Sequence, residues 1–212
     1  MLALLLHIDS VTQSMPNPFT EYLSSIVNLD ADSTAMIEER AKEVFFPKGH
    51  VISSAGTVCR YAYFLISGEA RSYYTNYAGK TITWTFHFNQ PVSNVKNLLI
   101  ADYKSYLTGK PASLTSETLT SVRAIQISKT DLDYALDYCL ICERAMRKVS
   151  DRSFIVAYDR SFTLLTMSAT ERYHKMIEEE PHLIKMFSNQ YIASYLGITP
   201  QSLSRIRSNN LS

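Results

Sequence analysis

The spacing of hydrophobic and polar positions changes twice along this chain of 212 residues. Residues 17–44 carry apolar side chains at intervals of three and four, which predicts helix. Residues 44–128 contain short runs of Val, Ile, Thr, Tyr and Phe between single glycines, and turn signals about ten residues apart are typical of a β-roll or jelly roll. Within this segment, residues 92–107 favour a short helix with flanking loops. Helical spacing returns after residue 128, so the pattern predicts an α+β protein.

A long helix is predicted after the β segment. Ser128 followed by Asp131 is a helix start signal, and residues 140–165 contain neither glycine nor proline. A helix of this length spans roughly 39 Å. Its apolar positions form two stripes, which are Ile141, Ala145, Val149 and Val156, and Ile155, Tyr158, Phe162 and Leu165. A helix with two apolar sides needs two partners, which we interpret as its own roll and a second copy of the chain. The alternative is a helix buried within one subunit.

A capping box formed by Ser168 and Glu171 opens the next helix and puts a hinge at residues 166–168. Beyond it, residues 187–207 read FSNQYIASYLGITPQSLSRIR and predict two short helices joined by a tight turn. Ser188 and Thr199 can cap these helices, and Gly197 allows the positive φ that the turn requires. This is the layout of a helix-turn-helix, whose second helix lies in the major groove of DNA.

The outer face of the second helix supplies the candidate DNA contacts, which are Thr199, Gln201, Ser202, Ser204, Arg205 and Arg207. This face has no acidic residue, and Arg and Gln are the side chains that read guanine and adenine. We expect Gln201 and Arg205 to reach base edges, with Ser202, Ser204 and Arg207 nearer the phosphates. The alternative is a helical hairpin that only packs a core.

The composition limits how DNA could be bound. Hydrophobic residues make up 46% of the chain and charged residues 19%, which is typical of a globular protein. The net charge is only +1, so a DNA-binding surface would be local. We therefore expect a homodimer on double-stranded DNA, at a pseudo-palindromic operator with half-sites about one helical turn apart.

Three cysteines, Cys59, Cys139 and Cys142, are too few for a disulfide framework. Cys139 and Cys142 have the spacing of half a zinc site or of a redox pair. No second pair and no close histidines complete a zinc site, so we favour a buried helical pair of small apolar side chains. We expect neither a metal ion nor a cofactor.

We expect a cytoplasmic protein, because the sequence suggests neither a membrane span nor a signal peptide. No run approaches the roughly 20 apolar residues of a membrane span. Residues 1–14 begin MLALLLHID without a basic region, so they do not resemble a signal peptide. We interpret them as a disordered leader or a start-site extension, with Met15 as the alternative start.

Three stretches give the chain a family resemblance. FPKGH at residues 46–50 with Gly56, YFLISGE at residues 63–69 and IASYLGITPQSLSRI at residues 192–206 resemble the Crp/Fnr family of bacterial transcription factors, closest to variants common in Bacteroidetes. The resemblance implies a double-stranded β-helix of the cyclic-nucleotide-binding type in residues 15–138. A dimerisation helix in residues 139–166 and a helix-turn-helix domain in residues 167–212 would follow.

The resemblance also locates a candidate effector pocket. Founding members of the family hold cyclic nucleotide through a Gly-Glu and a later Arg-Ser. The corresponding positions here are Ala101, Asp102, Leu114 and Thr115. The arginine is missing, and a buried cyclic phosphate would lack a compensating charge. Arg123 and Lys110 are near in sequence, but such residues are usually solvated. We expect that cyclic AMP is not the effector.

Other sensing modes of the family receive little support. No cysteine precedes Cys59 to hold an iron–sulfur cluster, and His50 and His87 are isolated histidines that favour packing or solvation over haem binding. Only five residues follow Arg207, so little or no DNA-binding wing is expected.

Two functional classes remain after motifs are considered. The chain lacks a glycine-rich phosphate loop, a nucleophile elbow and a zinc-protease motif, so an enzyme is not expected. We favour a regulator whose roll senses an unidentified small molecule. The alternative is a scaffold or partner-binding protein without ligand sensing. A closed, polar-lined cavity in the roll favours the first, and a cavity plugged by its many Tyr and Phe side chains favours the second.

Overall fold

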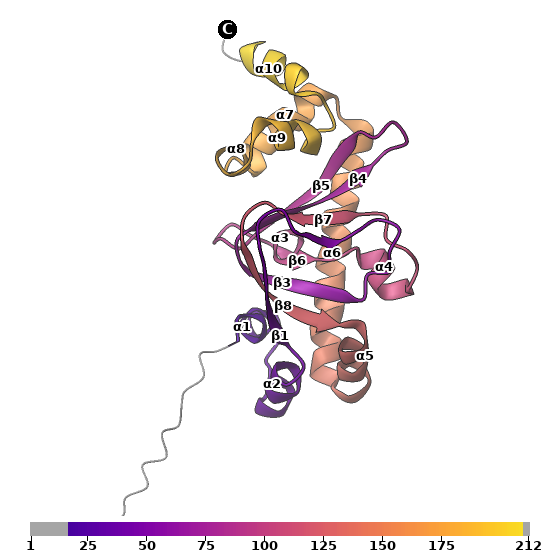
Figure 1. Cartoon of the computed structure of the whole chain (residues 1–212). Helices are drawn as coiled ribbons and strands as arrows, with labels where there is room; N and C mark the ends of the chain where they lie inside the picture. Colours follow the sequence, from indigo (N-terminus) through magenta and orange to yellow (C-terminus); the bar gives the residue numbers. More distant parts are fainter. Residues whose placement is uncertain (1–16, 210–212) are drawn as a thin grey trace, which may run out of the picture.

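The computed structural model describes residues 17–209, so the leader predicted for residues 1–14 lies outside the described residues. Two short helices precede a β-roll, a long helix runs along the roll, and a helical domain sits at the far end of that helix (Figure 1). The predicted α+β fold with a β-roll is confirmed.

The N-terminal region contains two helices, α1 (Pro18–Ser24) and α2 (Ala31–Glu38), and Val44 already belongs to a strand. The prediction of one helical stretch over residues 17–44 is therefore wrong in detail. Asn17 caps α1 by accepting the Phe19 N–H at 2.9 Å, and Asp30 caps α2 by accepting the Ser33 N–H at 2.8 Å. Because an N-cap residue starts a new helix, Asp30 separates the two.

The roll consists of two antiparallel sheets of four strands each. In the first sheet the order is β1 (Lys42–Phe46), β8 (Val122–Ser128), β3 (Tyr61–Ser67) and β6 (Leu99–Ile100). In the second it is β2 (Val51–Ser53), β7 (Thr115–Thr118), β4 (Glu69–Thr75) and β5 (Thr81–Phe88). Gly68 turns the chain from one sheet to the other with φ of 94°, and a Cβ there would lie 2.2 Å from the Ser121 carbonyl oxygen.

Residues 92–107 form more structure than the single short helix that we expected. They contain α3 (Val95–Leu98), the strand β6 and most of α4 (Tyr103–Thr108). The segment follows β5 and precedes β7 in the chain, and its helix α3 contacts both β5 and the long helix (Figure 1).

Helix α5 (Lys129–Tyr138) leads into α6 (Leu140–Thr166), which has 27 residues. Ala145 and Val149 are buried in one cluster with Leu23 and Ile37 of the N-terminal helices. The second stripe of α6 is exposed in this single chain, as described below. None of the helices in residues 17–209 is both long and apolar enough to cross a membrane.

The C-terminal domain contains α7 (Ala169–Glu179), α8 (Leu183–Met186), α9 (Asn189–Tyr195) and α10 (Pro200–Asn209). The capping box of Ser168 and Glu171 is present at the start of α7. The core of this domain continues into the roll, because Phe86 and Phe88 of β5 belong to the same buried cluster as Ile192 and Leu196.

Candidate nucleic-acid interface and effector pocket

Local signals in the sequence build the α9–α10 pair. The Ser188 hydroxyl accepts the Tyr191 N–H at 3.4 Å at the start of α9, and the Thr199 hydroxyl accepts the Ser202 N–H at 3.2 Å at the start of α10. Gly197 between them has φ of 71°. Leu203 of α10 is buried in one cluster with Ile192 and Leu196 of the α9 region. Each helix is thus capped, and the turn has a fixed geometry.

Helix α10 lies at the end of the molecule away from the roll (Figure 1). Gln201, Ser204 and Arg205 are exposed there, and Ser202 is half-buried. Arg207 lies differently, because its guanidinium donates to the Asn189 side chain at 2.7 Å and is half-buried. The exposed face of α10 therefore carries glutamine, serine and arginine side chains, and Arg207 is held against α9.

The domain that carries α10 is docked on the β4–β5 hairpin of its own roll. The Ser194 hydroxyl accepts the Thr83 N–H at 2.9 Å and donates to the Thr81 carbonyl oxygen at 3.0 Å. The Arg71 guanidinium lies over the Tyr191 ring at 4.3 Å. Because Ser194 and Thr83 are both buried, these hydrogen bonds replace water on both sides of the contact.

A charged network joins the long helix, the roll and the C-terminal domain. Arg160 of α6 donates to the Thr83 carbonyl oxygen at 3.1 Å and to the Tyr195 carbonyl oxygen. The Tyr195 hydroxyl donates to Glu180 at 2.8 Å, and Lys96 of α3 pairs with the same carboxylate. Burial raises the pKa of Glu180, but Lys96, Tyr195 and Arg160 together outweigh it and hold that pKa below its ordinary value.

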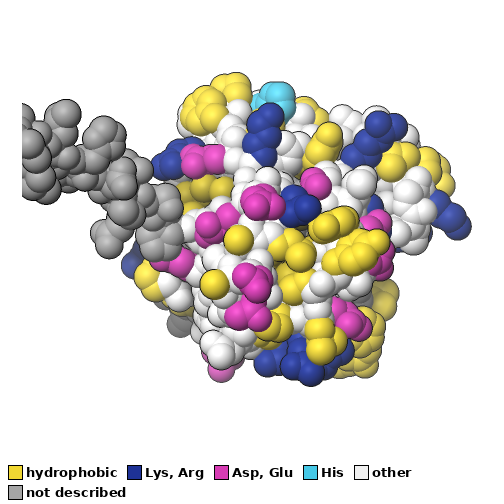
Figure 2. Space-filling view, turned by 90° about the horizontal axis from the view of Figure 1, so that it is seen from below, with side chains coloured by type: hydrophobic (Ala, Val, Ile, Leu, Met, Phe, Trp, Pro, Cys, Tyr) yellow, Lys and Arg dark blue, Asp and Glu magenta, His cyan; other side chains and the backbone are white. Residues whose placement is uncertain are grey.

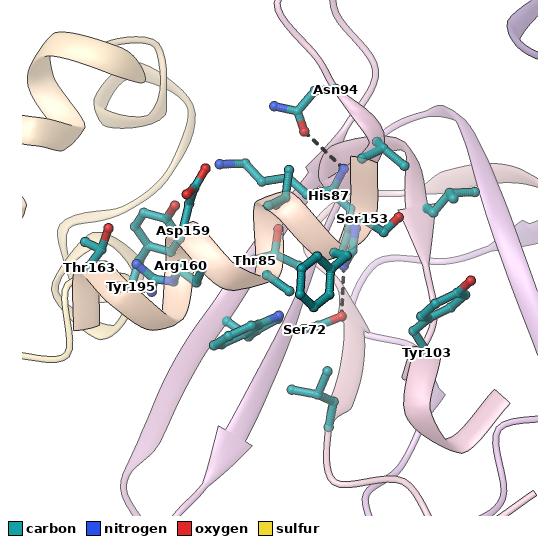
Figure 3. A pocket seen from close by; sticks show the side chains of 18 of the residues that line it. Ser72, Thr85, His87, Asn94, Tyr103, Ser153, Asp159, Arg160, Thr163 and Tyr195 are labelled. Carbon is teal, nitrogen blue, oxygen red and sulfur yellow. Dashed lines mark hydrogen bonds between the residues drawn. The ribbon is translucent and has the colours of Figure 1, made fainter. Parts of the chain in front are cut away.

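A pocket of about 590 Å³ lies where these three parts meet (Figure 3). The strands β4 and β5 contribute Ser72, Thr85 and His87, and Ser153 of α6 and Tyr103 face them. The end nearer the C-terminal domain holds the charged network. The pocket thus combines aromatic, hydroxyl and charged side chains, which suits a small polar ligand.

His87 and two serines form a buried polar chain at the roll side of this pocket. The His87 Nε2 is 2.8 Å from the Ser72 hydroxyl, which is 2.7 Å from the Ser116 hydroxyl. All three side chains are fully buried. Burial lowers the pKa of His87 to about 4, although the backbone of Lys96 and Asn97 partly offsets this effect. The imidazole is therefore neutral at pH 7.

Three of the four expected effector residues line this pocket, namely Ala101, Asp102 and Leu114. Thr115 is not among the lining residues, and its hydroxyl accepts the Ala55 N–H at 3.1 Å.

Both oxygens of the buried Asp102 carboxylate are occupied by backbone. Oδ1 accepts the Ser105 N–H at 2.9 Å, and Oδ2 accepts the N–H groups of Ser113 and Leu114 at 2.7 and 3.0 Å. Asp102 therefore connects the start of α4 to the residues that immediately precede β7.

Residues 43–138 match the family model of the cyclic nucleotide-binding domain. FixK2 from Bradyrhizobium japonicum is structurally similar, with a TM-score of 0.66 and 20% identity over 80% of this chain and 83% of that chain. A mutant of CooA from Carboxydothermus hydrogenoformans has a TM-score of 0.65 and 13% identity over 88% and 83%. A protein described as a putative transcriptional regulator of the Crp/Fnr family from Eubacterium rectale has a TM-score of 0.65 and 14% identity over 91% and 86%. No curated protein sequence matches significantly.

The chain has the fold of a Crp/Fnr regulator. It contains the cyclic nucleotide-binding domain, and helices follow that domain as in these neighbours. The family resemblance stated from the sequence is therefore confirmed.

Two basic residues that could have replaced the missing arginine lie elsewhere in the Crp/Fnr fold. Arg123 pairs with Glu43 at 2.7 Å between β8 and β1, and both side chains are about half exposed. Neither Arg123 nor Lys110 lines the pocket. His50 stacks on Phe46 with the ring centroids 5.0 Å apart, so it too is engaged outside the pocket.

Sequence reasoning missed the residues that join the roll to the C-terminal domain. Lys96, Arg160 and Glu180 carry no motif, and they meet only because α3, α6 and the end of α7 converge in this Crp/Fnr fold. A weak signal existed at Arg160, which is a charged residue in a helix that we expected to pack on both sides.

Proposed function

We propose that the chain is a homodimeric, DNA-binding transcription regulator whose effector is a small molecule other than cyclic AMP. The observation that carries the DNA-binding part is the exposed face of α10, on which Gln201, Ser204 and Arg205 are accessible to solvent. A capped helix with this face is suited to the major groove. The proposal assigns the chain no catalytic activity.

The second partner of α6 is proposed to be another copy of this chain. Its exposed stripe consists of apolar residues that are each more than half exposed, namely Phe154, Ile155, Tyr158, Phe162 and Leu165. Ile155, Tyr158, Phe162 and Leu165 recur at intervals of three and four, the spacing of helix-to-helix packing, and Phe154 lies four residues before Tyr158. Self-association through such a stripe would place two α10 helices on one duplex, as a pseudo-palindromic site requires.

The pocket supports the sensor interpretation over the scaffold interpretation. Among the roll aromatics, Phe64, Phe86 and Phe88 are fully buried in packing clusters, and none of the three lines the pocket. Tyr74, Trp84 and Tyr103 line it, together with hydroxyl groups and charged side chains. The aromatic side chains therefore leave this space open, and a ligand there would touch both the roll and α6.

Asp102 supports the exclusion of cyclic AMP. Its carboxylate accepts the N–H groups of Ser113 and Leu114, at the loop where the family resemblance puts the phosphate. A cyclic phosphate that bound these N–H groups would have to replace the carboxylate as their acceptor. The two negative charges would then lie close together. Without an arginine at that loop, the cost of bringing two anions together is uncompensated.

Selection of bound duplexes from a random DNA pool by the purified protein tests the DNA-binding part. We expect enrichment of a pseudo-palindrome with half-sites about one turn apart. A pool that stays random at low salt would contradict the proposal. Calorimetry with cyclic AMP tests the effector part separately, and micromolar binding at one site per roll would overturn it.

A further inference from the structure

Cys139 is the residue at which α5 ends and α6 begins. Its backbone is extended, with φ of −135° and ψ of 102°, and its sulfur accepts the Cys142 N–H at 3.1 Å as the N-cap of α6. The same sulfur is 3.4 Å from the Ser33 hydroxyl of α2. Cys139 is thus held by polar contacts, which a pair of merely apolar side chains would not require.

The helix behind Cys139 favours a negative charge on its sulfur. Helix α6 has 27 residues, and the N–H groups of a helix N-terminus stabilise an anion. Burial raises the pKa of Cys139, but hydrogen bonds from the Cys142 side chain, Ser33 and the backbone outweigh it, so the net pKa lies below its ordinary value. Thiolates of this kind occur at helix N-termini and in pairs with two intervening residues.

The other two cysteines differ from Cys139. Burial, followed by its hydrogen bond to Cys139, raises the pKa of Cys142 to about 12. Burial also raises the pKa of Cys59, which lies in the roll and has no cysteine neighbour in the sequence. The chain therefore holds one thiol whose pKa lies below its ordinary value, a second thiol three residues away whose pKa is raised, and one isolated thiol that serves as an internal reference.

We propose that Cys139 and Cys142 form a reversible thiol–disulfide site, in which Cys139 attacks and Cys142 resolves. The partner is a small-molecule disulfide. The Cys139 thiolate attacks one sulfur of that disulfide, its S–S bond breaks, and one thiolate leaves. The Cys142 thiol then gives its proton to the thiolate that has just left. Its sulfur attacks the Cys139 sulfur of the mixed disulfide, and this attack expels the second thiolate. Two cysteines are oxidised and the small disulfide is reduced to two thiols.

The surroundings permit this exchange. The side chains of Cys139 and Cys142 are already in hydrogen-bonding contact, and a disulfide needs their Cβ atoms about 3.5–4.5 Å apart. The Cys139 backbone is extended rather than helical, but its carbonyl oxygen accepts the Glu143 N–H at 3.0 Å as the first hydrogen bond of α6, so the disulfide would close by rotation of the side chain. Cys139 is only 8% exposed, but it lies between the strongly exposed side chains of Tyr138 and Leu140.

Oxidation of this pair would act at the N-terminal end of α6, opposite the C-terminal domain (Figure 1). Figure 2 looks at this end of the molecule, where apolar side chains are interspersed with charges of both signs. A disulfide would remove the thiol cap from the Cys142 N–H and the contact with Ser33 of α2. Oxidation would therefore weaken the packing of the N-terminal helices on α6.

The test is equilibration of the full chain in glutathione redox buffers, followed by acid quenching, alkylation and peptide mass analysis. We expect the peptide that contains both Cys139 and Cys142 to become two hydrogens lighter, while Cys59 stays alkylatable. In the reduced protein at neutral pH, Cys139 should react with iodoacetamide about tenfold faster than Cys59, or more.

Two serine variants test the assigned order of attack. Cys142→Ser should accumulate a mixed disulfide with glutathione at Cys139, whereas Cys139→Ser should leave Cys142 unmodified. Serine is itself a good N-cap, so Cys139→Ser keeps the start of α6. The proposal is overturned if the wild-type chain keeps three alkylatable thiols in every buffer, or if both variants form the mixed disulfide equally. Neither result bears on DNA binding.

Discussion

The ring of Phe86 in β5 stacks on the ring of Phe187, with centroids 3.9 Å apart and planes 9° from parallel. Phe86 belongs to the roll, whereas Phe187 comes directly before the helix-turn-helix. The C-terminal helical domain is thus packed on the β-roll as well as tethered to it by α6. Any change in the orientation of α10 relative to the roll must break this stack and the Ser194 hydrogen bonds to β5.

Replacing Phe187 with alanine should uncouple the C-terminal domain from the roll. Phe187 is buried, and a buried Phe→Ala change costs about 3–5 kcal/mol. We expect the C-terminal domain to unfold at a lower temperature in calorimetry, and proteases to cleave near Met167. Phe45→Ala is the control, because Phe45 is 64% exposed. An unchanged single unfolding transition would show that the stack does not couple the domains.

Replacing Asp102 with alanine should destabilise the roll. Three N–H groups, those of Ser105, Ser113 and Leu114, would lose an ionised acceptor, and the loss in the free energy of unfolding should be about 3 kcal/mol or more. Urea denaturation measures it, with the exposed Asp137→Ala as control. Phosphate can accept the same hydrogens and should restore part of the loss in the variant alone. A variant as stable as the wild type would show that Asp102 does not hold this loop.

His87 should make the folded state sensitive to acid. Its pKa is about 4 in the folded chain against 6.5 for the ordinary group, so between these values the unfolded chain binds the additional proton. Stability is therefore full above pH 6.5 and is lost as the pH falls towards 4. At 1.36 kcal/mol per pKa unit, the loss between pH 7 and pH 5 is about 2 kcal/mol. Urea denaturation of His87→Gln should lack this part of the loss; identical pH profiles would exclude His87 as its source.

The sequence predicted those parts of the molecule that depend on local signals. Capping by Ser168 and the turn at Gly197 follow from residues within a few positions of each other, and the structure has both. The pocket could not be predicted in this way. His87 meets Ser72 through the pairing of β4 with β5, and Arg160 reaches Thr83 across 77 positions. Such contacts depend on strand register and helix placement, which the pattern of residues in a single sequence does not specify.

The exposed stripe of α6 should determine the oligomeric state. Phe162→Glu puts a charge among the apolar side chains that we assign to the interface between two copies. Desolvating a carboxylate there is costly, so the variant should be monomeric in analytical ultracentrifugation at concentrations where the wild type is dimeric. Phe45→Glu is the matched control, because Phe45 is an exposed phenylalanine of β1. A monomeric wild-type chain, or a dimer that tolerates Phe162→Glu, would remove the stripe from the interface.

Arg205 should determine part of the operator preference. It is exposed on the outer face of α10, whereas the Arg207 guanidinium is hydrogen-bonded to the Asn189 side chain. A bidentate contact of Arg205 with guanine is worth about 1–3 kcal/mol, so Arg205→Ala should weaken operator binding about tenfold and relax one base position. Lys185→Ala, which removes an exposed charge of α8, should leave that preference unchanged. Gel-shift titrations on the selected operator and its single-base variants measure both effects. If Arg205→Ala loses affinity equally for every sequence, Arg205 contacts phosphate, and base reading must come from other side chains of α10.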